Sequence, residues 1–111
     1  MKPRLDVLAH GAEAIEAMKA LSHHVETCGL ERGLMELVKT RASQINGCGF
    51  CLYMHTRDAR RHGETEERLY LLDAWRESPL YTDRERAALG WTEALTRLAD
   101  TGAPDADYEA M

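Results

Sequence analysis

The sequence predicts an all-α protein, and three observations lead to this prediction. Ala, Leu, Glu and Arg, all good helix formers, dominate the 111 residues. Aromatic residues, which favour strands, make up only 6% of the chain. Apolar residues recur at spacings of three and four, and no segment alternates with the period of two that marks a strand. We therefore expect one domain over residues 1–111, with about five to six helices around a single core.

The first two expected helices end at glycines. Residues 12–28 carry an apolar stripe at helical spacing and are followed by Gly29, so they predict an amphipathic helix. Residues 30–46 repeat this pattern. Asn46 and Gly47 form a strong breaker pair, and the second helix is expected to stop there.

Two further helices are expected on either side of Gly63. One begins at or just before Cys48, with Gly63 as its C-terminal cap. The next opens at Thr65, whose hydroxyl can accept a hydrogen bond from a first-turn amide. Ser78 and Pro79 are expected to end it.

The clearest helix start is the stretch TDRE at residues 82–85, which has the capping-box pattern. In this pattern Thr82 and Glu85 satisfy each other's backbone amides, and the helix is expected to run to about Asp100. Residues 105–111 resemble the opening of one more helix.

Charge and cysteine content limit the classes of function. The net charge of −5, with both signs interspersed, leaves no broad basic face, so we expect no nucleic-acid partner. The first residues lack the apolar core of a signal peptide and no run approaches membrane-spanning length, so we expect no membrane partner and a cytoplasmic location. In that reducing compartment, three cysteines do not make a disulfide framework, and a Cys-x-x-Cys pair is more often catalytic or metal-binding.

Cys48, Cys51 and His55 form a cluster that can carry chemistry. Their spacings of three and four place the side chains within roughly 60° of one another on a helix. The preceding Asn-Gly break puts both cysteines in the first turn, where unpaired amides and the helix dipole favour the thiolate. A histidine one turn later can take the thiol proton, which supplies a base to the nucleophile. The pattern favours thiol redox chemistry.

The residues alone also allow other interpretations of this cluster. Two thiolates and an imidazole are three ordinary zinc ligands, so a zinc-stabilised helical binding module is the main alternative. Cys28, His23 or His24 would then supply a fourth ligand. The three side chains could also be an inert part of the core, or the cysteines could act as a redox sensor. Outside the zinc interpretation, Cys28 is expected to be a small buried hydrophobic residue.

Glu36 is the carboxylate that could act on the histidine. It lies within the apolar run of residues 34–38. Its side chain either faces solvent or turns inward, where it would hold an imidazole as the carboxylate of a catalytic triad does. The residues alone leave both orientations open.

Taken together, these residues resemble the carboxymuconolactone decarboxylase superfamily, in its alkyl hydroperoxidase D-like (AhpD-like) branch. The resemblance is close over residues 30–75 and looser over the flanking helices. It implies an AhpD-like all-α fold with the cysteine pair at a helix N-terminus. The positions that carry it are Glu36, Cys48, Gly49, Cys51, His55, Ala59 and Gly63.

The resemblance implies a thiol-dependent peroxidase that reduces alkyl hydroperoxides through a dithiol–disulfide cycle, without a metal or an organic cofactor. Cys51 would be the peroxidatic cysteine and Cys48 the resolving one. His55 and Glu36 would form the proton relay, so Glu36 is expected to turn inward. The implied partners are a peroxide substrate and an external dithiol protein. The decarboxylases that name the superfamily lack the cysteine pair, which argues against their reaction here.

The chain departs from the AhpD-like pattern at two places. Phe50 stands where well-known members have a second histidine, which implies that one relay member is absent. Members commonly continue for another helix or two beyond the position of Asp107, which implies a chain truncated at the C-terminus or a short member. The resemblance also implies a homo-oligomer, a trimer or a hexamer. The candidate buried or interface anchors are Trp75, Leu80, Tyr81 and Trp91.

Overall fold

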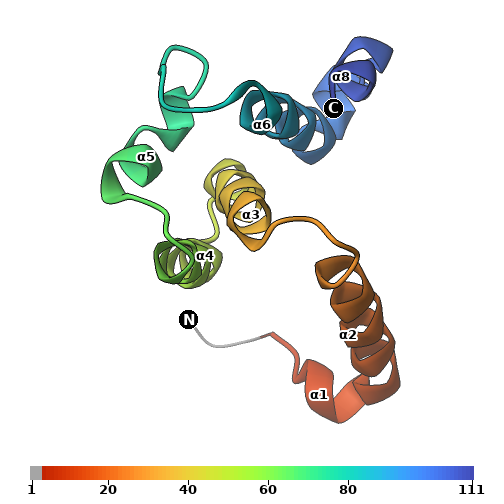
Figure 1. Cartoon of the computed structure of the whole chain (residues 1–111). Coiled ribbons are helices and arrows are strands. Elements are labelled where there is room, and N and C mark those ends of the chain that lie inside the picture. Colours follow the sequence, from red (N-terminus) through yellow and green to blue (C-terminus); the bar gives the residue numbers. More distant parts are fainter. Residues whose placement is uncertain (1–3) are drawn as a thin grey trace. The chain divides into compact units, whose positions relative to one another are not determined.

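The computed structural model describes residues 4–111, which contain eight α-helices, one 3-10 turn and no strand (Figure 1). The prediction of an all-α fold is confirmed. The count exceeds the five to six expected because four of the eight helices are short, whereas α2, α3, α4 and α6 have 13 to 15 residues each. The elements are α1 (Val7–His10), α2 (Ala12–Glu26), α3 (Arg32–Asn46), α4 (Gly49–Arg61), α5 (Glu66–Tyr70), η1 (Leu72–Ala74), α6 (Asp83–Thr96), α7 (Leu98–Thr101) and α8 (Asp105–Ala110).

The chain divides into two compact units, of which the first comprises residues 4–30 of the described part and the second residues 31–111. In the first unit, Asp6 caps α1 by accepting hydrogen bonds from two amides of its first turn. Neither α1 nor α2 contains a buried residue. The expected apolar stripe of α2 is present but remains more than half exposed at Met18, Leu21 and Val25. The expectation of a single domain stays a prediction.

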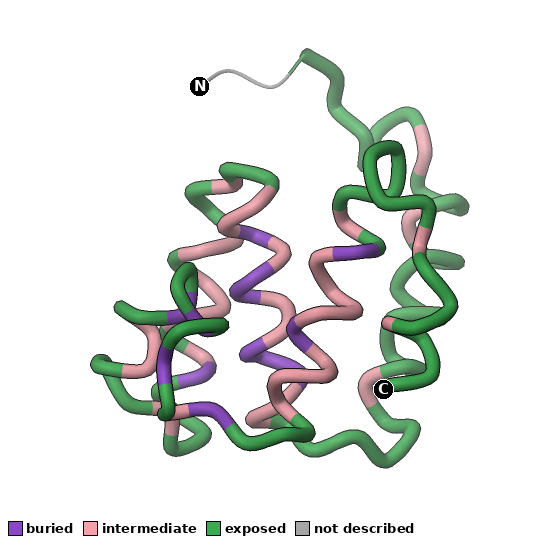
Figure 2. The backbone as a smooth tube through the Cα atoms, turned by 90° about the horizontal axis from the view of Figure 1, so that it is seen from above, coloured by how far each residue is buried: buried purple, intermediate pink, exposed green. Residues whose placement is uncertain are grey.

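The second unit is built around α3, which packs against α4 on one side and α6 on another. All buried positions among the described residues lie in this unit, as Figure 2 shows. The apolar stripes of α3 and α6 supply the core from opposite sides, and the segment between α5 and α6 closes it. The core residues are Leu37, Leu72, Trp75, Tyr81 and Leu89.

Glu93 ties α6 to the rest of this core. Its Oε1 accepts hydrogen bonds from Arg41 Nε of α3 at 2.9 Å and from the Trp75 indole at 2.8 Å. Arg76 donates to its Oε2 at 2.8 Å. Burial opposes the ionisation of Glu93, but the hydrogen bonds from Trp75 and Arg41 and the charges of Arg76 and Arg41 outweigh it, so its pKa is lowered.

The structure corrects the helix expected from Thr65 to Ser78. Thr65 is its N-cap as predicted, but α5 ends at Tyr70 and the 3-10 turn η1 follows. After this break Leu72 and Trp75 both lie in the core, and the Trp75 indole donates to Glu93. Tertiary packing therefore overrides the helical periodicity here.

The capping box at the start of α6 is confirmed, because the Thr82 and Glu85 side chains each accept a hydrogen bond from the other's backbone amide. The helix ends at Thr96 rather than near Asp100, and the single turn α7 follows. Of the anchors named from the sequence, Leu80 is partly buried and packs against the core. Trp75 and Tyr81 are core residues, whereas Trp91 is half-buried and meets the Tyr108 ring edge-on at 5.6 Å.

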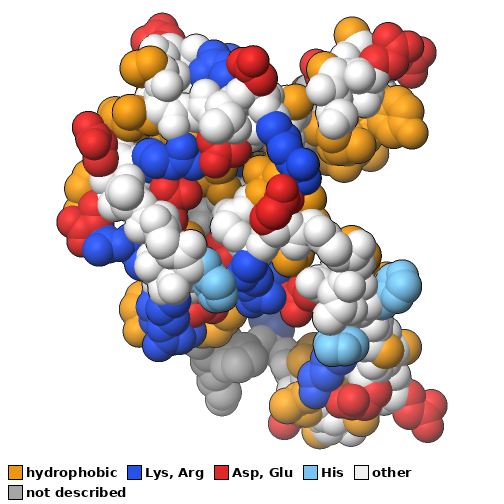
Figure 3. Space-filling model, viewed as in Figure 1, with side chains coloured by type: hydrophobic (Ala, Val, Ile, Leu, Met, Phe, Trp, Pro, Cys, Tyr) orange, Lys and Arg blue, Asp and Glu red, His pale blue; other side chains and the backbone are white. Residues whose placement is uncertain are grey.

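Charged side chains of both signs are interspersed over the face drawn in Figure 3. Within residues 4–111, no helix is both long and apolar enough to cross a membrane.

Candidate active site

The turn between α3 and α4 places the two cysteines. Gly47 caps α3 in the left-handed conformation, with φ of +63°, which favours glycine. Its amide and that of Cys48 return to the carbonyls of Gln44 and Ser43 at 3.2 and 3.1 Å. The chain thus reverses sharply, and Cys48 becomes the N-cap of α4.

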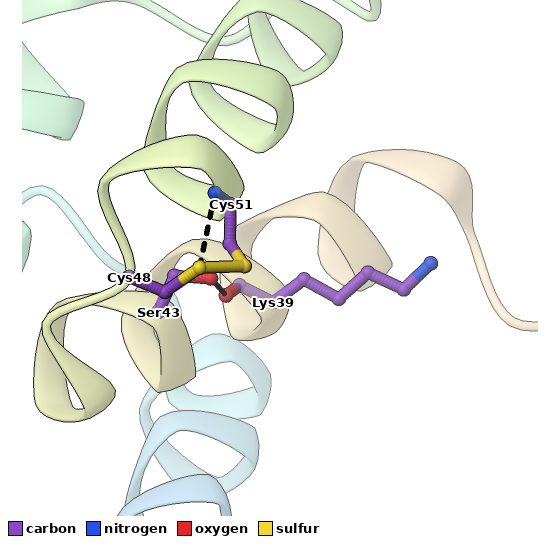
Figure 4. Close-up of a disulfide and its surroundings, with 4 residues drawn as sticks. All are labelled: Lys39, Ser43, Cys48 and Cys51. Carbon is purple, nitrogen blue, oxygen red and sulfur yellow. Dashed lines mark hydrogen bonds between the residues drawn. A yellow bond between two sulfur atoms is a disulfide. The ribbon is translucent and has the colours of Figure 1, made fainter. Parts of the chain in front are cut away.

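Cys48 and Cys51 form a disulfide, with their Cα atoms 5.3 Å apart. The Cys48 sulfur also accepts a hydrogen bond from the Cys51 amide at 3.3 Å, so it occupies the position of a helix-capping oxygen. Figure 4 shows the sulfur pair at the start of α4 beside Ser43 of α3, while the Lys39 side chain extends away from it. Both cysteines are half-buried. The prediction that the pair lies at a helix N-terminus is confirmed.

Glu36 and His55 meet between α3 and α4. His55 Nδ1 lies 2.8 Å from Glu36 Oε2, and the two residues are 19 positions apart in the chain. Glu36 is turned inward with only 1% of its surface exposed, as the resemblance implied. Because an ionised carboxylate only accepts hydrogen bonds, it fixes the proton of a neutral His55 on Nδ1 and leaves Nε2 as a base.

In the structure, the four predicted site residues form two bonded pairs. The disulfide links Cys48 to Cys51 and a hydrogen bond links Glu36 to His55. Both pairs share α4, where His55 follows Cys51 by one turn. The hydrogen bonds of residues 4–111 include none between the His55 ring and either sulfur, so helix spacing alone brings the two pairs together in this disulfide form. The roles assigned to these residues remain predictions.

Arg32 belongs to this arrangement and was missed from the sequence. Its Nε lies 3.2 Å from Glu36 Oε1, the oxygen that His55 does not contact. The spacing of four residues on one helix was the available signal, because such pairs face each other. This spacing could not identify Arg32 from the sequence, because the residues alone did not show whether the Glu36 side chain turns inward or toward solvent.

Two other expectations concern Phe50 and Cys28. Phe50, where the resemblance implies a missing histidine, is 74% exposed. Cys28 is a free, exposed cysteine, so the expectation that it is buried is wrong. It lies in the first unit just after α2, a helix without buried residues, and therefore has no core to enter. Among the described residues, no three His, Cys, Asp or Glu side chains come together as a set that could hold a metal ion.

The fold and the site geometry define an all-α protein with a redox-type cysteine pair at a helix start and a buried carboxylate–imidazole pair one turn further on. Comparison with known protein families shows which family has this fold and site. The carboxymuconolactone decarboxylase family matches residues 9–94, and the chain belongs to this family. The resemblance stated from the sequence is thereby confirmed.

The similarity to known proteins extends over different lengths of this chain. YdfG, an uncharacterized protein of Bacillus subtilis, is 39% identical over 111 residues, which are all of this chain and 76% of YdfG. A crystal structure of a protein of unknown function from Agrobacterium tumefaciens, provisionally described as an antioxidant defence protein AhpD, superposes with a TM-score of 0.89 at 46% identity. That match covers 98% of this chain and 75% of the other. Alkyl hydroperoxide reductase AhpD of Hyphomonas neptunium is 44% identical over 41 residues, 37% of this chain and 23% of that protein.

Proposed function

We propose that this protein is a thiol-dependent peroxidase, an alkyl hydroperoxidase-like disulfide oxidoreductase. The observation that carries the proposal is the Cys48–Cys51 pair at the start of α4, with the Glu36–His55 hydrogen bond one turn away. The cycle needs a peroxide and an external dithiol protein, and it uses no metal or organic cofactor. Similarity to proteins whose names include AhpD supports the same class of activity.

In the oxidative half of the cycle, His55 takes the proton of the Cys51 thiol. The thiolate attacks one oxygen of the hydroperoxide, the O–O bond breaks, and the leaving alkoxide receives a proton to become an alcohol. Cys51 is now a sulfenic acid. The Cys48 thiol condenses with it, which forms the disulfide and releases water. Glu36 stabilises the imidazolium that forms on His55 during proton transfer.

In the reductive half, a thiolate of the partner dithiol attacks one sulfur of the disulfide and the other leaves as a thiolate. The Cys51 amide donates to the Cys48 sulfur at 3.3 Å, and it would stabilise negative charge there. Cys48 is therefore the better leaving group, and the partner attacks Cys51. A mixed disulfide on Cys51 then resolves when the second partner thiol attacks the partner's own sulfur, which returns both cysteines to the reduced form.

Serine variants of the three cysteines test the cycle. We expect Cys51→Ser to lose peroxide consumption, because no sulfenic acid can form. Cys48→Ser in a Cys28→Ser background should undergo one stoichiometric oxidation of Cys51 and then stop. Cys28→Ser alone is the matched control, since Cys28 is exposed and lies outside the disulfide. Stopped-flow peroxide consumption with a dithiol reductant, together with thiol titration, gives the readout. Parent-like turnover by both the Cys51 and the Cys48 variants would overturn the mechanism.

Native mass spectrometry separates this proposal from the zinc alternative. The redox cycle predicts that the reduced protein loses two hydrogen atoms on mild oxidation and carries no stoichiometric zinc. One zinc per chain, lost together with folding when a chelator is added, would favour the binding module. A single slow oxidation without turnover would favour a redox sensor.

We also propose that the protein assembles as a homo-oligomer, a trimer or a hexamer. The exposed apolar residues Met18, Leu21 and Val25 of α2 support this, because a monomer would leave them in water. Light scattering on the eluting peak of a size-exclusion column measures the subunit number, and a monomer at micromolar concentration would contradict the proposal.

A further inference from the structure

Arg32 holds the side of Glu36 that His55 leaves open. Arg32 Nε lies 3.2 Å from Oε1, while His55 Nδ1 lies 2.8 Å from Oε2. The Glu36 side chain is 1% exposed and that of Arg32 is 42% exposed. The ion pair therefore connects a buried carboxylate to a cation at the edge of the site, and each carboxylate oxygen has a partner.

We propose that Arg32 is a positioning residue, which keeps Glu36 ionised and aims its Oε2 at the Nδ1–H of His55. The inference rests on the function proposed above, in which His55 is the base for Cys51. Arg32 acts through Glu36 and does not touch the reacting sulfur.

Through Glu36, Arg32 determines which ring nitrogen of His55 carries the proton. A carboxylate accepts only, so it selects the tautomer with the proton on Nδ1 and the lone pair on Nε2. A protonated Glu36 could instead donate to Nδ1, which would favour the opposite tautomer with the proton on Nε2. In that state His55 cannot take the Cys51 proton.

Removal of Arg32 would favour the protonated form of Glu36. A buried carboxylate without a cation or donor at one oxygen is costly, and a buried acid responds by taking up a proton. Arginine suits the position, because its planar guanidinium stays charged and its Nε faces Glu36 Oε1. A lysine would keep the charge with a less directed donor.

Other charged groups around α3 and α4 have partners of their own. On α4, the pKa of Asp58 is lowered mainly by a hydrogen bond from Arg57, and the charge of Arg32 adds a smaller effect. On the side of α3 that faces η1 and α6, Arg41 binds Asp73 and Glu93. Among the described residues, the ionisable side chains in contact with the Glu36 carboxylate are those of Arg32 and His55.

The test compares three variants of the full chain: Arg32→Met, Arg32→Lys and Arg84→Met. Arg84 is the matched control, because it pairs with the exposed Glu31 at 2.8 Å and takes no part in the site. Two readouts are needed: the kcat/KM for peroxide as a function of pH, and the imidazole ¹⁵N shifts of His55 in the reduced protein. The shifts report the tautomer directly and require no activity.

We expect Arg32→Met to lower kcat/KM about tenfold at neutral pH, as loss of a group that orients a functional histidine typically does. The loss of rate should accompany the change of tautomer, because only the Nδ1–H form leaves Nε2 free to take the Cys51 proton. Arg32→Lys should retain most of the rate, and Arg84→Met should match the parent. The His55 shifts should move toward the Nε2–H tautomer in Arg32→Met alone.

Two outcomes would overturn the inference. One is a parent-like rate and tautomer in Arg32→Met at every pH. The other is a loss of rate while the tautomer stays as in the parent, because that result indicates a merely structural role. If the parent itself consumes no peroxide, the proposed function fails, and the ¹⁵N shifts still decide whether Arg32 sets the state of Glu36 and His55.

Discussion

At the scale of single residues, the contacts of Glu36 explain its burial. A carboxylate with 1% of its surface exposed is stable only when its oxygens are paired, and Arg32 and His55 bind one oxygen each. The Thr40 hydroxyl in turn donates to the Glu36 backbone carbonyl at 2.7 Å, so the polar groups of this part of α3 are satisfied. Glu36 is thus built into the packing of α3 against α4, and its single hydrogen bond to His55 connects that packing to the cysteine helix.

Glu36→Gln tests the carboxylate directly. The amide keeps the shape but carries no charge, so we expect the rate at which peroxide oxidises Cys51 to fall about 10- to 100-fold at pH 7, as when an orienting carboxylate loses its charge. Rapid-mixing kinetics on the reduced protein measures this rate. Glu31→Gln is the control, because the Glu31 side chain is 59% exposed and pairs with Arg84 instead. Equal rates of Cys51 oxidation in both variants would show that Glu36 takes no part in the proton relay.

At the scale of elements, the α3–α4 turn positions the chemistry. Gly47 holds a left-handed conformation that ends α3 and lets Cys48 cap α4. A Cβ at this position would meet no atom within 4 Å, so the requirement for glycine comes from the backbone conformation alone. The turn that makes Cys48 the N-cap of α4 and puts Cys51 in its first turn therefore favours glycine at position 47.

Gly47→Ala should lower the free energy of unfolding by about 1 kcal/mol, the cost of a left-handed conformation for a residue with a Cβ. Gly33→Ala is the matched control: Gly33 lies inside α3 with no atom within 4 Å of its Cβ position. There alanine should raise stability by about 0.5 kcal/mol. Urea unfolding of the reduced proteins measures both changes. A Gly47→Ala protein as stable as the parent would show that the turn accommodates the side chain.

At the scale of the whole molecule, stability in acid should depend on Glu93, which joins α3, the Trp75 segment and α6. Its pKa is lowered in the folded protein, so near and below the usual pKa of a glutamate the unfolded chain binds more protons than the folded one. The stabilisation is therefore complete above that usual value and is lost as pH falls through the lowered pKa.

Glu93→Gln should lower the free energy of unfolding by about 2 kcal/mol at pH 7, since hydrogen bonds to a charged group are lost. The difference from the parent should shrink as pH falls below about 4.5, where the unfolded chain of the parent takes up its proton. Chemical unfolding at pH 7 and at successively lower pH measures it, with the exposed Glu109→Gln as control. A pH-independent difference would indicate that shape rather than charge stabilises the junction.

The sequence by itself determined the all-α fold, the long helices α2, α3, α4 and α6, and the cysteine pair at a helix start. These features depend on local spacing, on breakers such as Gly47 and on caps such as Thr82, whose effects reach only a few residues along the chain. Family resemblance added the inward direction of Glu36. Only the tertiary structure decided the break after α5, the exposure of Cys28 and the contact of Arg32 with Glu36. Each of these depends on which side chains other elements bring near, and periodicity within one helix carries no information about that.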